Sequence, residues 1–306
     1  MKILVTGGAG FIGSNLSDEL IKKGHEVIVI DNLSSGKKAN VNSKAIFYEL
    51  DITDPKLEEV FKKHSPDYVI NHAAQISVTN SVANPLNDAK SNILGLINVI
   101  ENCAKYKVKK IISVSSGGVV YGDPKDLPAK EDYPFDPLSP YGISKMTGEF
   151  YIRFYNKIHG LRYTIFRYSN VYGPRQDPHG EAGVIAIFSR LLIEGKQPRI
   201  FGSGEQQRDY VYVKDIVGAN IMALTKGDGE AFNIATGVPT SVNTLFKNMK
   251  EITKYSGAAK YEPERPGELF RNFLDCSKAK KILSWQPKYT LKEGLSETIE
   301  WFRKNP

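Results

Sequence analysis

Short runs of mainly apolar residues, each about the length of one buried strand, recur along the first half of the chain. The runs fall at residues 2–6, 26–30, 47–50, 67–71, 110–114 and 163–168. They are apolar over most of their length and do not alternate strictly with polar residues, as is typical of parallel strands buried on both faces. Segments with helical spacing lie between them, notably 11–23, 85–106 and 140–159. This alternation predicts an α/β fold with a doubly wound parallel sheet over residues 1–170.

The pattern changes after Asn170. Residues 173–180 are rich in glycine, proline and polar residues, and no regular alternation of strand and helix follows, although helices are expected at 241–255 and 291–303. We therefore predict that residues 171–306 form a smaller C-terminal α/β lobe that binds the substrate. Later segments of this lobe could still cross back to the first domain.

Composition narrows the class of protein further. Of the 306 residues, 41% are hydrophobic and 25% charged, as in ordinary soluble globular proteins. The net charge of +7 is scattered and forms no basic block, so we expect no nucleic-acid partner. The two cysteines are far apart and lack metal-ligand neighbours, which argues against a disulfide framework or a metal site. No charged leader or long apolar run precedes the first strand, so we expect a cytoplasmic protein without a membrane span.

A glycine-rich turn follows the first predicted strand and opens the first predicted helix. Gly7, Gly10 and Gly13 would allow a tight turn, a close approach of the backbone to a diphosphate, and close packing of the helix on the strand. The second strand ends in Asp31, whose carboxylate can accept hydrogen bonds from both ribose hydroxyls and would repel a 2′-phosphate. The motif thus predicts a Rossmann-type site that prefers NAD to NADP.

Other strand ends add candidates for the same site. Asp51 and Ile52 could contact the adenine ring, although an acid at this place could equally cap a helix. Ala73 and Ala74 are small enough to leave room for a cofactor, whereas the preceding His72 has no obvious catalytic partner and is assigned no role.

A second motif points to proton transfer. Tyr141 and Lys145 follow Pro140 and would stand four residues apart on one face of a helix. A fixed ammonium near a phenol favours the phenolate, which can act as a base. Ser115 and Ser116 end the fifth strand, where α/β folds bind ligands. The Tyr-x-x-x-Lys pattern is common by chance, and it is the nucleotide motif at the N-terminus that gives it weight.

Taken together, these motifs resemble the extended short-chain dehydrogenase/reductase family, most closely its UDP-glucose (UDP-galactose) 4-epimerase group. The resemblance runs the full length of the chain. It rests on the segments TGGAGFIG, DNLSSG, SSGGVVYG, PYGISK, RYSNVYGPRQ, RPGE and LSWQPKYTLKEGL. The first and fourth of these segments are shared by the whole family, whereas Asn170, Arg208 and Arg265 point to a nucleotide-sugar substrate.

The resemblance implies roles for individual residues. Tyr141 would be the catalytic base, and Lys145 would hold the nicotinamide ribose and lower the pKa of Tyr141. In many epimerases the catalytic hydroxyl lies at the position of Gly117, so we assign it to Ser116, with Ser115 as the reserve. The implied NAD contacts are Gly7, Gly10, Phe11, Ile12, Gly13, Asp31, Asn32, Ser34, Gly36, Asp51, Ile52, Ala73, Ala74, Gln75, Asn92, Val114, Tyr141, Lys145 and Tyr168. The implied substrate contacts are Ser116, Asn170, Val184, Phe201, Arg208, Arg265, Glu268 and Asn272.

The activity implied by the resemblance is inversion of C4 of a UDP-hexose through a transient 4-keto sugar, with tightly bound NAD, in a homodimer. A 4,6-dehydratase is disfavoured because Gly117 and Gly118 stand where such enzymes carry an acid pair. Two relatives with the same chemistry stay open, the UDP-glucuronate and the UDP-N-acetylglucosamine 4-epimerases. Asn272, at a position that limits the size of the C2 substituent, leaves N-acetylated sugars open. A catalytically silent NAD-binding regulator is a further alternative, against which Tyr141 and Lys145 argue.

Overall fold

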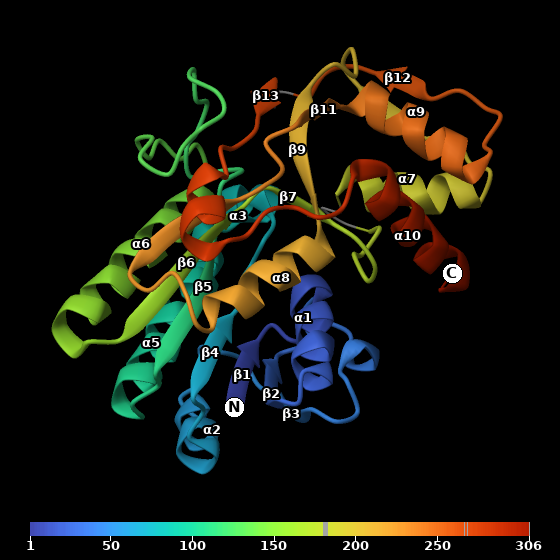
Figure 1. Ribbon diagram of the computed structural model, residues 1–306. Helices are drawn as coiled ribbons and strands as arrows, with labels where there is room; N and C mark the ends of the chain where they lie inside the picture. The colour runs from blue at the N-terminus through green and yellow to red at the C-terminus, as the bar shows by residue number, and fades with distance from the viewer. Residues whose placement is uncertain (180–182, 266, 268, 306) are drawn as a thin grey trace.

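The computed structural model describes residues 1–179, 183–265, 267 and 269–305. A larger lobe is built on a central sheet, and a smaller lobe, carrying the C-terminus, lies over one end of that sheet (Figure 1). The two lobes meet where the strands of the central sheet end.

The central sheet has seven strands, all parallel, in the order β10-β6-β5-β4-β1-β2-β3. This confirms the doubly wound parallel sheet expected from the sequence. The order reverses at β1, so that β1 lies between β4 and β2. The strands are β1 (Lys2–Thr6), β2 (Glu26–Asp31), β3 (Ile46–Glu49), β4 (Tyr68–Asn71), β5 (Lys110–Ser116), β6 (Arg162–Tyr168) and β10 (Glu230–Ile234).

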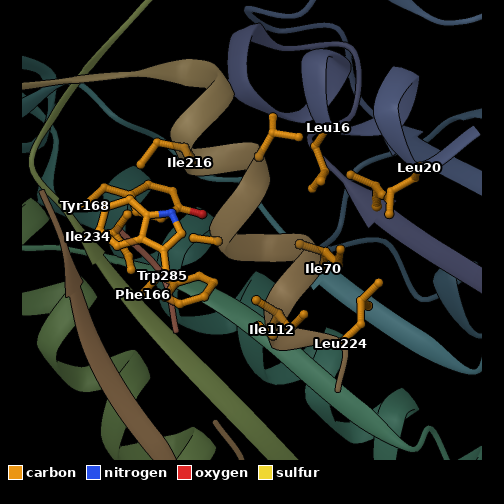
Figure 2. Close-up of a cluster of buried hydrophobic side chains, with 14 of the residues drawn as sticks. Leu16, Leu20, Ile70, Ile112, Phe166, Tyr168, Ile216, Leu224, Ile234 and Trp285 are labelled. Carbon is orange, nitrogen blue, oxygen red and sulfur yellow. The ribbon is translucent and has the colours of Figure 1, made fainter. Parts of the chain in front are cut away.

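Helices cover both faces of this sheet. One face packs against α1 (Phe11–Lys22) and α8 (Val213–Ala223), whose leucine and isoleucine side chains meet those of the strands around Trp285 (Figure 2). The other face packs against α2 (Leu57–His64), α5 (Gly95–Lys105) and α6 (Pro140–His159). The sheet is therefore covered on both sides, which is why its strands are mainly apolar and do not alternate strictly with polar residues.

The segment predicted as one helix over 85–106 is interrupted. It consists of α4 (Pro85–Ala89), one π-helical turn, η2 (Lys90–Leu94), and α5, and is preceded by α3 (Val78–Ala83). Single π-helical turns inside helices are frequent at functional sites. Asn92, a predicted cofactor contact, lies in this turn. A short 3₁₀ helix, η1 (Lys38–Asn40), follows β2.

The smaller lobe is organised around a second sheet in which β9 lies between β11 and β13, and β7 also pairs with β9. β8 and β12 form a separate pair. Three helices pack against one another and on this lobe's own core. Its elements are β7 (Asn170–Tyr172), α7 (Val184–Ile193), β8 (Arg199–Phe201), β9 (Gln207–Tyr212), β11 (Pro239–Ser241), α9 (Val242–Thr253), β12 (Lys260–Glu262), β13 (Arg271–Asn272) and α10 (Leu291–Lys304).

The chain crosses between the lobes repeatedly. After β9 it returns to the larger lobe as α8 and β10, and it returns again as the π-helical turn η3 (Ala279–Leu283). A strand–helix–strand unit thus does follow residue 171, contrary to the expectation that regular alternation ends there. The expected helices at 241–255 and 291–303 correspond to α9 and α10.

Candidate active site

A cavity of about 280 Å³ opens at the carboxyl ends of the parallel strands. Residues that follow β1, β4 and β5 line it, and so does the start of α6. β1 and β4 are neighbours in the sheet, but the chain continues from β1 toward β2 and β3 on one side and from β4 toward β5 and β6 on the other. The cavity therefore lies at the topological switch point, where open α/β sheets bind their ligands.

The glycine turn forms one wall of the cavity. Gly7 has a φ of +67°, and a Cβ there would lie 2.7 Å from the backbone nitrogen of Ala73. A Cβ on Gly13 would overlap the carbonyl oxygen of Gly7. A side chain at either place would displace the backbone of the turn or of the segment after β4, so both positions require glycine for close packing at the N-terminus of α1. A diphosphate fits this cradle, because the free N–H groups of a helix start favour an anion.

Asp31 ends β2 at the far side of the same cavity. Its carboxylate accepts hydrogen bonds from the backbone nitrogens of Ala9 (2.9 Å) and Leu33 (2.8 Å), which fix its orientation. A Cβ on Gly36 would come within 2.8 Å of Asp31 Oδ1, so the chain passes closely here. A carboxylate has room for further hydrogen bonds, and this one suits the hydroxyls of a ribose.

Asp51 takes part in hydrogen bonds of its own. It accepts from the backbone nitrogen and the hydroxyl of Thr53 (both 2.8 Å) and from the side-chain amide of Asn32 (2.6 Å). Burial acts to raise the pKa of Asp51, but these hydrogen bonds outweigh it and leave the pKa lowered. The carboxylate thus organises the turn before α2 while it also lines the cavity. Asp51 lies where an adenine contact would require it, but it does not cap α2, whose N-cap is Lys56 without a side-chain cap bond.

The proton-transfer pair stands at the start of α6. Ser139 caps this helix by accepting a hydrogen bond from the Gly142 nitrogen (3.2 Å), and Pro140 occupies its first turn. Lys145 Nζ lies 5.7 Å from the centroid of the Tyr141 ring and donates to the Val114 carbonyl oxygen (3.1 Å). The Ser116 side chain lies close enough to the Tyr141 hydroxyl to act on it as a hydrogen-bond donor that lowers its pKa. The Ser116 hydroxyl, the Tyr141 phenol and the Lys145 ammonium thus line one part of the cavity.

Burial governs the acidity of both groups. Burial raises the pKa of Tyr141 to about 12; the hydrogen bond from Ser116 lowers it, and the charge of Asp88 raises it. Burial also lowers the pKa of Lys145 to about 8, against an upward effect of Asp88. A lysine with this pKa is mostly protonated at neutral pH. The phenol needs additional positive charge in the cavity before it can act as a base near neutrality.

The structure explains why Gly117 carries no side chain. A Cβ at this position would overlap Cδ1 of Leu274 and lie 3.4 Å from the Arg167 carbonyl oxygen. Leu274 is fully buried beside Val120 and Ala129, so it has little space in which to retreat. Of the two remaining hydroxyls, Ser116 reaches Tyr141, whereas the Ser115 Oγ is buried and has no hydrogen-bond partner. This geometry favours Ser116 over Ser115.

Most of the predicted cofactor contacts line this one cavity, together with Ser115 and Ser116. The cofactor contacts that line it are Gly7, Gly10, Phe11, Ile12, Gly13, Asp31, Asn32, Ser34, Asp51, Ile52, Ala73, Ala74, Val114, Tyr141, Lys145 and Tyr168. Gly36 lies behind Asp31. Gln75 and Asn92 are bonded to each other: Asn92 accepts from the Gln75 nitrogen and donates to its carbonyl oxygen, both at 2.9 Å. They brace the wall of the cavity and do not line it.

Apart from Ser116, the predicted substrate contacts that the structure describes lie in the smaller lobe and outside the cavity lining. Parallel pairing on β9 sets Asn170 beside Tyr210 and Asn272 beside Arg208, which brings three distant segments together. The Arg265 guanidinium stacks on the Phe201 ring at 3.9 Å. Val184 begins α7. Glu268 lies outside the described residues.

Asn272 makes a hydrogen bond to the larger lobe. It is 4% exposed, and its side-chain amide donates to the Gly118 carbonyl oxygen at 3.1 Å. It therefore ties the smaller lobe to the loop that follows Ser116.

Several lining residues were not anticipated. Ser169 follows β6 with a buried, unpartnered hydroxyl, and its place between two expected contacts, Tyr168 and Asn170, was the available signal. His72 also lines the cavity; its Nε2 lies 3.3 Å from the Tyr168 hydroxyl, and burial lowers its pKa to about 3. It is a neutral ring packed beside the strand ends, in keeping with the absence of a role assigned from sequence. Ser91, in the π-helical turn, carried no sequence signal.

Two features are absent from the described residues. These residues contain no group of three or more histidine, cysteine or acidic side chains arranged to hold a metal ion. Nor is any helix in the described part of the chain both long and apolar enough to cross a bilayer.

Comparison with known proteins agrees with this geometry. Residues 3–235 match the model of the NAD dependent epimerase/dehydratase family. A putative UDP-glucose 4-epimerase of Methanocaldococcus jannaschii is 50% identical over 99% of both chains.

Solved structures are equally similar. A UDP-glucose 4-epimerase of Thermotoga maritima, solved with UDP-glucose, has 53% identity and a TM-score of 0.98 over 99% of each chain. A Thermus thermophilus UDP-glucose 4-epimerase, solved with NAD, has 39% identity and a TM-score of 0.94 over the whole of each chain. With the family model spanning the cavity walls and relatives matching from end to end, the chain belongs to the NAD-dependent epimerase/dehydratase family.

Proposed function

We propose that this protein is a UDP-glucose 4-epimerase, which interconverts UDP-glucose and UDP-galactose through a transient 4-keto sugar. The observation that carries the proposal is the meeting of Ser116, Tyr141 and Lys145 at the wall of a cavity whose glycine turn and Asp31 suit NAD. Full-length similarity to UDP-glucose 4-epimerases supports this choice of substrate over its uronate and N-acetylated relatives.

The chain's own residues would handle the proton. Tyr141 takes the proton of the sugar 4-hydroxyl and returns it after the sugar has turned its other face. The Ser116 hydroxyl lies beside the phenol and would hydrogen-bond both the phenol oxygen and the sugar 4-oxygen, so that it keeps the two aligned for proton transfer. Lys145 supplies a fixed positive charge beside the ring and a donor for the ribose of the cofactor. When bound, NAD supplies a hydride acceptor that is regenerated within each turnover, and a positive charge within the cavity.

The smaller lobe would hold the UDP. Arg208 and Arg265 have the planar guanidinium fork that suits diphosphate oxygens. Asn170 and Val184 border the same region at the start of β7 and α7. Contacts remote from C4 anchor the nucleotide while the hexose reorients, so their binding energy is available throughout the reaction. We assign the substrate lobe to residues 171–306, apart from the segments that return to the larger lobe.

Two further properties belong to the same proposal. Exposed apolar residues recur on one face of α6, namely Ile143, Phe150, Tyr151, Phe154 and Ile158. Such a stripe suits a two-fold pairing of α6 with its copy, so we propose a homodimer.

The two cysteines of the chain are not joined by a disulfide, and we propose a reducing, cytoplasmic location for the protein.

The purified protein can be tested without added cofactor. UDP-galactose, UDP-glucuronate and UDP-N-acetylgalactosamine are incubated separately, and each C4 epimer is measured by chromatography. We expect conversion of UDP-galactose to be fastest. Ser116→Ala should lose most of the turnover, while Ser115→Ala should keep most of it. No epimer from any of the three sugars, with NAD present in the protein, would refute the proposed function.

A further inference from the structure

A buried acid outside the cavity lining lies next to the proton-transfer pair. Asp88, in α4, is 1% exposed. Its Oδ1 accepts from the side-chain amides of Gln75 and Asn92, both at 2.9 Å, and its Oδ2 accepts from the Ser144 hydroxyl at 2.6 Å. Buried carboxylates are costly unless they are fully hydrogen-bonded, and this one is held from three different parts of the chain.

These partners join the segments that frame the site. Gln75 belongs to the loop after β4, and its Nε2 also donates to the Ser77 carbonyl oxygen at 2.9 Å. Asn92 sits in the π-helical turn. Ser144 directly precedes Lys145 and lies one turn after Tyr141 on α6. A shift of Asp88 would therefore reach the two reacting side chains through a single hydrogen bond.

The charges around Lys145 give Asp88 a second role. Within the described residues Lys145 forms no salt bridge, and its ammonium is buried in the cavity wall. His72, which follows β4 and is neutral, lies near enough to feel the charge of Lys145. Tyr168 of β6 lines the same cavity and is un-ionised, because burial raises its pKa. Glu149, on α6 itself, is bound to Arg167 of β6 at 2.7 and 2.8 Å. Of the two carboxylates among these groups, Glu149 is paired with an arginine, whereas Asp88 forms no salt bridge within the described residues.

We propose that Asp88 is a positioning residue for proton transfer: it fixes the first turns of α6 through Ser144, and its charge keeps the buried Lys145 protonated. The proposal rests on the proposed function for its meaning in catalysis. Its electrostatic content concerns the protein alone and can be measured without turnover.

The sign of the effect follows from the surroundings. Asp88 raises the pKa of both Lys145 and Tyr141. Removing its charge should lower both pKa values. The alkaline limb of the rate, where the ammonium is lost, should then move to lower pH. Each pH unit of displacement means an about tenfold smaller protonated fraction at a given alkaline pH.

Asp88→Asn is the discriminating variant. The amide oxygen can still accept from Gln75 and Asn92, and the amide nitrogen can donate to Ser144 once that hydroxyl turns, so the charge is removed while the contacts are kept. Asp215→Asn is the matched control. Asp215 is also buried and accepts from the backbone nitrogens of Lys288 and Tyr289, but it lies on α8, outside the cavity lining.

Two readouts are needed. The first is kcat/KM for UDP-galactose against pH. The second is the Cε chemical shift of Lys145 against pH in protein labelled with ¹³C-lysine, with the resonance assigned by its loss in Lys145→Arg. We expect Asp88→Asn to move the alkaline limb and the Lys145 titration to lower pH, and Asp215→Asn to move neither.

The outcomes are separable. An unchanged Lys145 titration in Asp88→Asn would overturn the proposal, even if the variant is less stable. If Asp88→Asn displaces the Lys145 titration but the wild-type protein epimerises no sugar, the proposal for Asp88 is supported and the proposed function alone is refuted. Should Asp88→Asn fail to fold, the wild type decides, because a Lys145 already neutral at pH 7 would contradict the proposal and a protonated one would agree with it.

Discussion

Gly117→Ser tests the packing that we hold responsible for the position of the proposed catalytic hydroxyl, Ser116. The new Cβ would overlap Leu274 Cδ1, and Leu274 is fully buried against Val120, so the leucine or the loop must move. Overpacking of this kind costs about 1–3 kcal/mol. We expect a lower midpoint of urea unfolding and a loss of turnover, because the displaced loop carries Ser116.

Leu274→Ala removes the side chain with which a serine at position 117 would overlap. Alone it should cost about 2–5 kcal/mol, since it leaves a cavity in the core. Combined with Gly117→Ser, the loss should be smaller than the sum of the single losses, with a coupling of about 0.5–3 kcal/mol as found for residues in contact. The three variants are compared by urea unfolding and by epimerase assay.

The double variant also offers a test of chemistry. With space for a serine at position 117, its hydroxyl could substitute for Ser116, so Ser116→Ala should be less harmful in that background than in the wild type. Gly117→Ser with wild-type stability and turnover would refute the reasoning, because it would mean that Leu274 does not occupy the space.

The remaining predictions concern single side chains. Tyr141→Phe should lower kcat by at least about 10² while NAD content, measured in the denatured protein, stays unchanged; near-normal turnover would remove the phenol from its role. Glu149→Gln should cost about 3–5 kcal/mol of unfolding free energy, because it leaves the Arg167 guanidinium buried without its counter-charge; a cost below about 1 kcal/mol would show that the pair is not truly desolvated. Arg208→Leu should raise KM for UDP-galactose about tenfold to a hundredfold, as loss of a charge-assisted hydrogen bond predicts, and an unchanged KM would exclude a diphosphate contact.

Local features of the sequence predicted much of the cofactor side. The glycine turn, Asp31 and the Tyr141–Lys145 spacing act through neighbouring residues, so their geometry follows from the strand and helix that carry them. The strand ends after β4 and β5 likewise lie together because parallel strands share one edge.

Features that depend on distant partners could not be read in the same way. The space at Gly117 is decided by Leu274, which arrives from the far end of the chain. An acid such as Asp88 on a polar helix reads as a solvated surface residue, and only the packing of α4 on α6 shows it to be buried. In the π-helical turn, Asn92 is hydrogen-bonded to Gln75 of another segment, a contact that helical spacing does not encode.

The return of β10 to the central sheet has a consequence for how the molecule can be divided. A fragment ending near Asn170 would lack β10 and would leave one edge of β6 with unpaired backbone N–H and C=O groups. Such an exposed edge strand promotes aggregation with other chains. The fragment would also lack Asn233, whose Oδ1 accepts a hydrogen bond from the Tyr121 hydroxyl and whose backbone pairs with that of Arg167. The larger lobe is thus completed by a strand from after residue 170, and we expect that a chain cut at this point does not form the larger lobe as a free-standing module.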